Sequence, residues 1–211
     1  MSDNEISELQ YINKKNLNRY RRIRQHTMEM LHDRGYKIEN NITNDKCFKE
    51  HFINKELKDL NISCLNSRNE SIYVHFFGCD IRKSSIDDSL KYLCEQDYDG
   101  AIFIFKDPMN SIISNRVAEV NFNNLILLET FIEDELTVNV SRHSFVPRHI
   151  LLSESEKLAV LEKYRSTADQ FPRIFVTDPV AKYYRAARNQ MFHIIRQYDD
   201  GEQYDTYRMV V

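Results

Sequence analysis

Residues that could hydrolyse a phosphodiester are present in the chain, but their spacing does not suit that reaction. Metal-dependent nucleases place carboxylates and a lysine around a divalent cation, which stabilises the attacked phosphate and activates water. An acidic-x-Lys triplet occurs at Glu56-Leu57-Lys58, and Asp80 and Asp107 follow strand-like runs. The triplet falls on a helical segment ahead of these runs, and no acidic-x-Lys strand follows either aspartate. We therefore expect no catalytic residues and no enzyme activity.

Two histidines could form part of a metal site. His143 and His149 lie on either side of Pro147, so an ordered loop could bring their rings together. Structural zinc nearly always takes four ligands, however, and the chain has no C-x-x-C or H-x-x-x-H partner pattern. We expect buried, hydrogen-bonding histidines and no bound metal.

Cofactor binding is also disfavoured. The chain has only four glycines and contains no P-loop, G-x-G-x-x-G or G-x-S-x-G motif. Loops that cradle phosphate are hard to build without glycine, so we expect no cofactor and no small-molecule substrate. The four cysteines lie 15 or 17 residues apart, which suits reduced, mostly buried thiols in a cytosolic or nuclear protein. They are Cys47, Cys64, Cys79 and Cys94.

The composition indicates a folded chain. Of the 211 residues, 42% are hydrophobic and 11% aromatic, enough for a packed core, and four prolines and four glycines favour long helices and strands. No run approaches the roughly 18 apolar residues of a membrane span. The acidic opening Met-Ser-Asp-Asn-Glu lacks an apolar signal region, so we expect neither secretion nor a membrane partner.

A basic cluster near the start of the chain overlaps a predicted helix from Lys15 to Arg34, and it consists of Lys14, Lys15, Arg19, Arg21, Arg22 and Arg24. The apolar stripe of this helix contains Leu17, Tyr20, Ile23, Thr27, Met30 and Leu31. At about 100° per residue, the opposite face carries Lys14, Lys15, Arg21 and Arg22. These cations either are solvated or contact an acidic protein surface, or they favour nearby DNA phosphates without reading bases.

The rest of the first part alternates strands and helices. Strand-like runs occur at residues 72–77, 101–105 and 125–128, and the second run is apolar enough to be buried on both faces. Helical stripes lie between them, carrying Ile86, Leu90, Leu93 and Cys94, and then Ile112, Ile113, Val117 and Val120. Asn44 is a candidate cap of an earlier helix that carries Phe48 and Phe52. Alternation of this kind predicts an α/β domain with crossover connections.

The charge balance predicts a boundary between residues 140 and 141. Residues 1–140 carry 18 Lys and Arg against 23 Asp and Glu, whereas residues 141–211 carry 11 against 9. In the second part, Ser153 and Glu156 form a capping box, and Asp178 followed by Pro179 begins a short helix. A β-hairpin is predicted around Asp199-Asp200-Gly201. About 70 residues with this α+β pattern form only a marginal core, so we expect the module to be stabilised by binding to a partner.

The second part also resembles a known family. It resembles "subunit five" of eukaryotic nuclear RNA polymerases I, II and III, and the smaller archaeal counterpart of that subunit, over residues 141–211. The first 140 residues resemble the eukaryotic N-terminal jaw domain through Arg34-Gly35-Tyr36 and the later strands. The matching blocks of the second part are His143-Ser-Phe-Val-Pro147-Arg148-His149, Leu152-Ser-Glu-Ser-Glu-Lys157, Leu161-Glu-Lys-Tyr-Arg165, Gln170-Phe-Pro-Arg-Ile174, Asp178-Pro-Val-Ala-Lys-Tyr183, Ile194-Ile-Arg196 and Tyr207-Arg208.

The resemblance implies a non-catalytic subunit of a DNA-directed RNA polymerase. Residues 141–211 would be the assembly module that docks on the largest subunit. Residues 1–140 would form part of the lower jaw beside downstream duplex DNA, on a fold similar to restriction endonucleases without their catalytic residues. Tyr164, Ile174 and Tyr183 are expected in the core. The expected contacts with the largest subunit are His143, Pro147, Arg148, His149, Arg173, Asp178, Pro179, Arg196, Tyr207 and Arg208.

The chain departs from the family pattern at three places. Arg185 and Asn189 stand where the family has glycine, and residues 198–202 replace a Ser-x-Thr-Ala-Gly hairpin. Such departures indicate a divergent member, which would be nuclear in a cellular polymerase and cytoplasmic or virion-borne in a viral one. The alternative is a free-standing nucleic-acid-binding or nuclease-like factor on the same scaffold.

Overall fold

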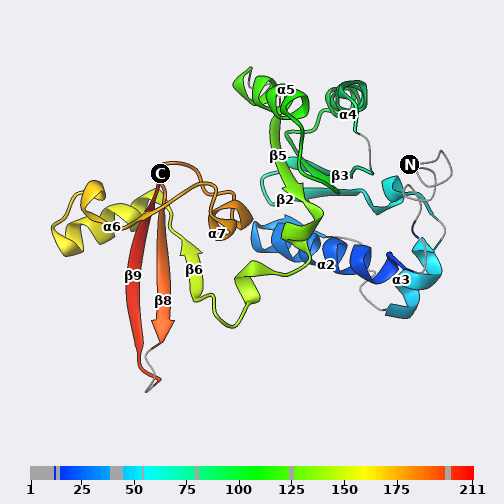
Figure 1. The fold of residues 1–211 in the computed structure, drawn as a ribbon. Coiled ribbons are helices and arrows are strands. Elements are labelled where there is room, and N and C mark those ends of the chain that lie inside the picture. Colours follow the sequence, from blue (N-terminus) through cyan, green and yellow to red (C-terminus); the bar gives the residue numbers. More distant parts are fainter. Residues whose placement is uncertain are drawn as a thin grey trace. The chain divides into compact units, whose positions relative to one another are not determined.

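The chain folds into two compact units, each with its own sheet (Figure 1). The computed structural model describes residues 12, 15–38, 45–53, 55–78, 81–123, 126–197 and 201–211. The units are Met1–Val138 and Asn139–Val211, a division two residues before the one suggested by the charge balance. No helix in the described ranges is both long and apolar enough to cross a membrane.

The first unit is built on a mixed five-stranded sheet of order β1-β2-β3-β4-β5. Strands β1 to β3 are antiparallel neighbours, whereas β3, β4 and β5 are parallel, so α4 and α5 are crossover helices. In chain order its elements are α2 (Leu17–Asp33), β1 (Tyr36–Lys37), α3 (Asp45–Phe52), the 3-10 helix η1 (Leu57–Leu60), β2 (Ile62–Asn66), β3 (Ser71–Phe76), α4 (Lys83–Glu95), β4 (Gly100–Phe105), α5 (Ser111–Phe122), β5 (Leu127–Ile132) and the 3-10 helix η2 (Glu133–Leu136).

Strand β4 lies at the centre of this unit. All six of its residues are buried, which confirms the predicted burial on both faces. Alternate residues Ala101, Phe103 and Phe105 pack against α4 and α5, while α2 lies on the other side of the sheet (Figure 1). His75 on β3 is enclosed by aromatic rings, with ring centroids 4.2 Å from Phe77 and 6.0 Å from Phe103. Burial lowers its pKa to about 4.

The helix predicted from Lys15 to Arg34 is confirmed as α2, but it spans Leu17–Asp33, so Lys15 lies in the turn before it. The predicted apolar stripe is buried, and Gly35, which follows the C-cap residue Arg34, takes a φ of +89°. On α3, Phe48 and Phe52 are buried and their ring centroids lie 4.5 Å apart. Asn44, the suggested cap of that helix, lies outside the described residues.

Other expectations for the first unit were wrong in detail. The strand predicted at residues 125–128 is Leu127–Ile132, because its parallel register runs from Gly100↔Leu127 to Phe105↔Ile132. Ile112 is 61% exposed, since it precedes the inward positions Ile113 and Val117 on α5. Strands β1 and β2 were not predicted.

The expectation of mostly buried cysteines was also wrong. Cys64 is buried, but Cys47 and Cys94 are exposed. Cys94 sits at the border of the α4 stripe, one residue after the buried Leu93. Cys79 lies outside the described residues.

The second unit has a four-stranded sheet of order β6-β8-β9-β7. Strands β8 and β9 form the predicted antiparallel hairpin, whereas β6 and β7 were not predicted. The tip of the hairpin, at residues 198–200, lies outside the described residues. The elements are the 3-10 helix η3 (Val140–Arg142), β6 (Arg148–Leu151), α6 (Glu154–Tyr164), the 3-10 helix η4 (Ala168–Gln170), β7 (Arg173–Ile174), α7 (Pro179–Tyr183), β8 (Met191–Gln197) and β9 (Gln203–Val210).

Both predicted helix starts in this unit are confirmed. The Ser153 and Glu156 side chains each accept from the other's backbone N–H at the start of α6. The Asp178 side chain accepts from the Val180 N–H at 2.9 Å, with Pro179 in the first turn of α7. These caps satisfy amides that the helix itself leaves without partners.

The apolar side of α6 is not part of the core. Leu158 is 57% and Tyr164 45% exposed, so the expectation that Tyr164 belongs to the core was wrong. Lys157 is the buried residue of this helix and donates to Glu154 at 3.1 Å. Ile174 and Tyr183 are buried, as expected.

Arg185 and Asn189 both take left-handed backbone conformations, with φ of 52° and 70°. The chain therefore keeps the backbone that glycine would favour at both positions. Asparagine tolerates this conformation better than other non-glycine residues, whereas arginine adopts it at a steric cost.

Candidate interaction surfaces

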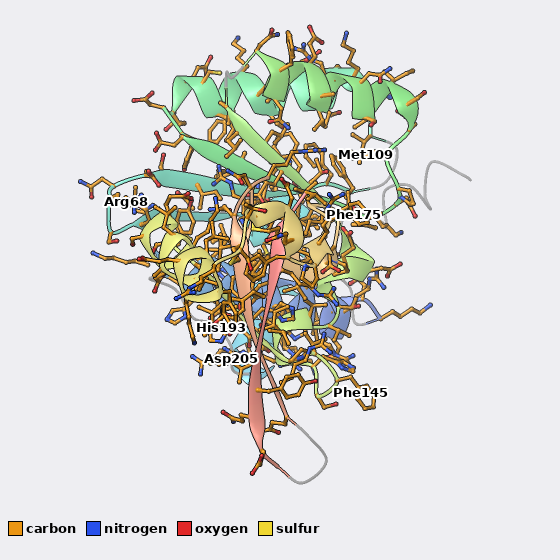
Figure 2. All side chains as sticks on the ribbon, turned by 90° about the vertical axis from the view of Figure 1, so that its left-hand side faces the viewer. Arg68, Met109, Phe145, Phe175, His193 and Asp205 are labelled. Atoms are coloured by element: carbon orange, nitrogen blue, oxygen red, sulfur yellow. The ribbon has the colours of Figure 1, made fainter. Side chains whose placement is uncertain are left out.

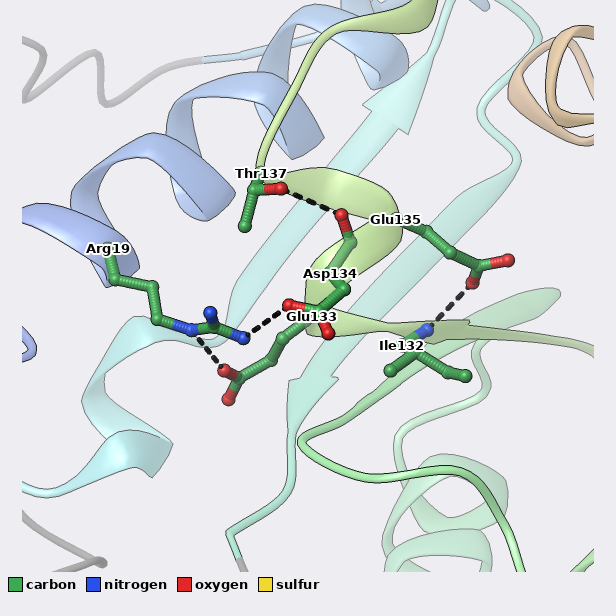
Figure 3. A network of polar contacts seen from close by, with 6 residues as sticks. All are labelled: Arg19, Ile132, Glu133, Asp134, Glu135 and Thr137. Carbon is green, nitrogen blue, oxygen red and sulfur yellow. Dashed lines mark hydrogen bonds and ion pairs between the residues drawn. The ribbon is translucent and has the colours of Figure 1, made fainter.

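Arg19, a member of the basic cluster, is tied to the opposite end of the first unit's sequence (Figure 3). Its Nε lies 2.9 Å from Glu133 Oε2 and its Nη2 lies 3.0 Å from Asp134 Oδ1. Thr137 donates to the Asp134 carbonyl, and the Ile132 amide donates to Glu135. The contacts fasten α2 to η2, so Arg19 is a structural residue.

The carboxyl of Glu133 is almost fully buried, with 1% exposure. Loss of hydration raises its pKa, and the hydrogen bond from Arg19 only partly opposes that rise. Burial also acts on Arg19, but its side chain is 41% exposed, and hydrogen bonds to Glu133 and Asp134 outweigh the effect and raise its pKa. The raised pKa of Glu133 means that its charged form is disfavoured in the folded chain, whereas the raised pKa of Arg19 means that its charged form is favoured. Desolvation of Glu133 dominates in this pair, because Glu133 is the more buried partner.

Arg24 is a buried cation of the same helix. It is 7% exposed, and desolvation lowers its pKa. Its Nη1 lies 3.2 Å from Met28 Sδ, and its guanidinium carbon lies 5.3 Å from the Phe52 ring centroid. No hydrogen-bond partner of Nε is present in the described ranges. Arg24 therefore cannot contact phosphates at the surface.

The remaining cations form what we call the basic face of α2. Of the four residues predicted there, Lys15 and Arg22 are exposed and Arg21 is partly buried. Lys14 lies outside the described residues. Acidic residues are absent from the first turn of α2. The basic face is thus compatible with contact to an anionic partner.

In the second unit, strand register places some of the predicted contact residues on one side of the sheet. His149 pairs with Ile194 and Arg208 with Phe192, and Arg196 follows on the same face of β8. Phe192 and Ile194 belong to the core, and Asp178 and Pro179 begin the helix α7 that also contributes to it. His149, Asp178, Arg196 and Arg208 are close enough to interact electrostatically.

His149 holds its ring by a local hydrogen bond. Its Nδ1 lies 2.7 Å from the Pro147 carbonyl oxygen, a geometry that requires the Nδ1–H tautomer. Desolvation lowers its pKa; the Pro147 hydrogen bond and Asp178 oppose this, while Arg208 and Arg196 reinforce it. His143, in contrast, is exposed and accepts from the Phe145 N–H at 3.3 Å. Across the described ranges, no three His, Cys, Asp or Glu residues are grouped to hold a metal ion.

The other predicted contact residues lie on the opposite face of the sheet. Arg148 and Tyr207 point there, as does Arg173 through its register with Met209. The Tyr207 ring stacks on His193 at 5.0 Å and meets Tyr164 edge-on at 5.6 Å. The predicted contact residues therefore occupy both faces of the sheet.

The Tyr207 ring is part of a short polar and aromatic array. His193 Nε2 lies 2.7 Å from Asp205 Oδ1, and the two residues stand on neighbouring strands of the hairpin (Figure 2). Desolvation raises the Tyr207 pKa, as do the neighbouring Tyr164 and Asp205. The array fixes the Tyr207 ring within the unit.

A groove of about 580 Å³ lies where β6 begins and β8 ends. It includes the predicted residues Pro147, Arg148 and Arg196, but also residues that were not predicted. Phe145, one of these, is 89% exposed. The sequence feature that could have identified Phe145 as a surface residue is its position in a loop that contains Pro147. The groove is lined by Ser144, Phe145, Val146, Pro147, Arg148, Ile195, Arg196, Gln197, Gln203 and Tyr204.

Two models of one protein family match the chain. The family model described as "RNA polymerase Rpb5, C-terminal domain" matches residues 138–210. The model described as "RNA polymerase Rpb5, N-terminal domain" matches residues 14–95. The two matches fall in the two different units.

Similar proteins occur in several eukaryotes. A Dictyostelium discoideum protein named "DNA-directed RNA polymerases I, II, and III subunit rpabc1" is 32% identical over 198 residues, which cover 92% of this chain and 98% of that protein. A Caenorhabditis elegans protein named "DNA-directed RNA polymerases I, II, and III subunit RPABC1" is 30% identical over 202 residues, covering 90% and 94%. An Arabidopsis thaliana "DNA-directed RNA polymerase subunit 5-like protein 1" is 30% identical over 205 residues, with the same coverage.

Proposed function

The chain belongs to the RNA polymerase Rpb5 family, and we propose that it serves a multisubunit DNA-directed RNA polymerase as a non-catalytic structural subunit that docks on the largest subunit. The observation that carries this conclusion is the match of both family models, one in each unit. The relatives named as subunits of polymerases I, II and III are matched over nearly their whole length. Nuclear localisation is proposed on the same basis.

A free-standing nuclease is not supported. Glu56 and Lys58, the acidic-x-Lys candidates, pair with each other at 2.7 Å on the surface. Asp107 is exposed, and Asp80 lies outside the described residues. We propose that the first unit has a restriction-endonuclease-like fold used without catalysis. Its mixed sheet with two crossover helices supports this.

We assign the second unit to docking. Its arginines support this role: Arg148, Arg173, Arg196 and Arg208 form no ion pair with a carboxylate in the described ranges. Guanidinium groups suit fixed carboxylate partners on another chain. The exposed apolar residues of α6, Leu158 and Tyr164, offer further surface to cover.

We assign the first unit to the lower jaw, beside downstream DNA. The basic face of α2 supports a weak contact with duplex phosphates, because Lys15 just before the helix and Arg22 on it are exposed, and such a contact reads no base. The contact would add to the affinity of the whole polymerase without conferring sequence specificity.

Affinity purification of the full chain, followed by cross-linking, tests the assignment. We expect a tagged chain to recover the subunits of a multisubunit polymerase in amounts equal to its own. Amine cross-links from Lys163 and Lys182 in the second unit should reach the largest subunit. Recovery of the chain alone would contradict the proposed function, and cross-links that reach only other subunits would contradict the docking assignment.

A further inference from the structure

The groove in the second unit has an open strand edge. Strand β8 continues to Gln197, but its pairing with β6 ends at Arg148↔Ile195. Arg196 and Gln197 keep their partners on β9 and have none on the β6 side within the described ranges. An open edge offers backbone donors and acceptors to an extended segment.

Arg196 also has unused hydrogen-bonding capacity at this place. Its Nε is buried, and no partner for it exists in the part of the chain that the structure describes. A buried donor without a partner costs free energy, and the Arg196 guanidinium is therefore not committed to an internal acceptor through Nε. A carboxylate is the acceptor that matches a guanidinium fork, since it can accept two parallel hydrogen bonds.

The charge of the groove points in the same direction. Arg148 and Arg196 are its two charged lining residues, and none of the described lining residues is acidic. Gln197 and Gln203 add neutral amide groups. The lining is therefore suited to a carboxylate.

The apolar part of the lining favours a protein segment over a nucleic acid. Phe145, Val146 and Ile195 provide apolar surface beside the two arginines, and Phe145 projects beside the hairpin (Figure 2). Nucleic-acid grooves carry a series of cations that follows the phosphates. The hairpin sequence that continues from this groove is instead acidic, Asp199-Asp200-Gly201-Glu202.

We propose that this groove binds an extended segment of another polymerase subunit, with an Asp or Glu side chain of that segment received by Arg196, with the charge of Arg148 on the other face of the sheet also favouring an acidic segment, and with apolar side chains against Phe145. The inference rests on the proposed function, because it specifies the chemistry of the docking surface. It also separates Arg148 and Arg196 from Arg173, which lies outside the groove.

Charge reversal in the full-length chain tests the role of the two arginines. The variant Arg148→Glu with Arg196→Glu is compared with Arg68→Glu with Arg188→Glu. The control pair is exposed, lies outside the groove and changes the net charge equally. We expect recovery of polymerase to fall at least tenfold for the groove variant and to remain at the wild-type level for the control. Arg196→Lys, which keeps the charge and loses the fork, should fall between them.

The outcomes separate the two proposals. Full recovery by the groove variant overturns the groove assignment and leaves the proposed function standing, whereas failure of the wild-type chain to recover polymerase contradicts the proposed function itself. Unchanged thermal unfolding of the groove variant shows that a loss of recovery does not come from misfolding. If that variant unfolds, the pair Arg148→Gln with Arg196→Gln is used, and its full recovery has the same meaning.

A photoreactive benzoylphenylalanine at position 145, in chain assembled into polymerase, identifies the occupant. We expect a cross-link to a peptide of another subunit that contains Asp or Glu. A cross-link to nucleic acid, or to a peptide without a carboxylate side chain, overturns the proposal.

Discussion

The guanidinium of Arg34 meets the carboxylate of Glu129 through two nearly parallel hydrogen bonds of 2.9 and 2.8 Å. The pair joins the end of α2 to strand β5, and the two side chains are 5% and 16% exposed. Arg34 is followed by Gly35 with its positive φ and by the buried Tyr36 of β1. The three consecutive residues thus have different structural roles: Arg34 forms an ion pair, Gly35 makes the turn, and Tyr36 begins strand β1.

Replacing Arg34 by methionine should destabilise the first unit. Glu129 would remain as a nearly buried carboxylate without its main cation, and removal of one partner of a buried pair costs roughly 3 kcal/mol. Urea unfolding followed by circular dichroism measures the change. The double variant Arg34→Met with Glu129→Leu should recover most of the loss, and a double variant as unstable as the single one would contradict this explanation.

Glu133→Gln should change how stability depends on pH. The folded-state pKa of Glu133 is raised above its ordinary 4.5, so the folded chain holds this proton more tightly than the unfolded chain. Its contribution to stability is therefore present below pH 4.5 and is lost as the pH rises through the folded-state pKa. Glutamine does not titrate, so the variant should gain on the wild type as the pH rises above 4.5.

Thermal unfolding of both chains across this range checks the expectation for Glu133. Asp134→Asn is the matched control, since the Asp134 side chain is 79% exposed. A constant difference between wild type and Glu133→Gln at all pH values would show that burial of the Glu133 charge is not the cause.

His75 should make the first unit sensitive to acid. Burial lowers its pKa to about 4, whereas an unfolded chain binds the proton near pH 6.5. The unfolded state therefore takes up a proton first as the pH falls, and stability is lost between about pH 6.5 and 4. At pH 5 this amounts to about 2 kcal/mol. His75→Phe should remove most of that loss, which unfolding at pH 7.5 and pH 5 would measure; equal losses in both chains would contradict it.

Arg24→Met should raise the free energy of unfolding by roughly 1 kcal/mol, since a well-packed apolar side chain often replaces a buried charge at no cost or with a gain. The main contacts of Arg24 are with a sulfur atom and an aromatic ring, both of which methionine can keep. Arg22→Met, at an exposed position, should have little effect. A clear loss of stability in Arg24→Met alone would mean that the Arg24 charge is better compensated than these contacts indicate.

The basic face of α2 should contribute to the salt dependence of DNA binding by the assembled polymerase. Each lost phosphate contact reduces the slope of log affinity against log salt concentration by about 0.9. A variant with alanine at Lys14, Lys15, Arg21 and Arg22 should therefore flatten the slope by several units if all four touch phosphate. An unchanged slope would eliminate contact with DNA and favour a contact with protein.

Local patterns were enough to predict the central elements. Periodicity located α2, an unbroken apolar run located β4, and side-chain caps located the starts of α6 and α7, because these depend on residues close in sequence. Strands β1 and β7 have two residues each, and their existence depends on pairing with β2 and β9. No local pattern carries that information.

The interaction surfaces likewise combine features that local sequence predicts with features that depend on distant residues. The sequence placed the cations on α2, but it could not show that Arg19 pairs with Glu133, 114 residues away, or that Arg24 is buried. The proximity of His149, Arg196 and Arg208 follows from strand register, which the sequence did not specify. The groove depends on where β6 stops pairing with β8.

The exposed apolar residues of helix α6 should affect how long the unassembled chain persists in the cell. Its apolar residues Leu158 and Tyr164 lie at the surface of the free chain, together with Phe175 at 69% exposure. Exposed apolar patches promote aggregation and attract chaperones and proteases. Copies made in excess of the other subunits should therefore be short-lived, so the abundance of this chain would follow the supply of its assembly partners and not its own rate of synthesis.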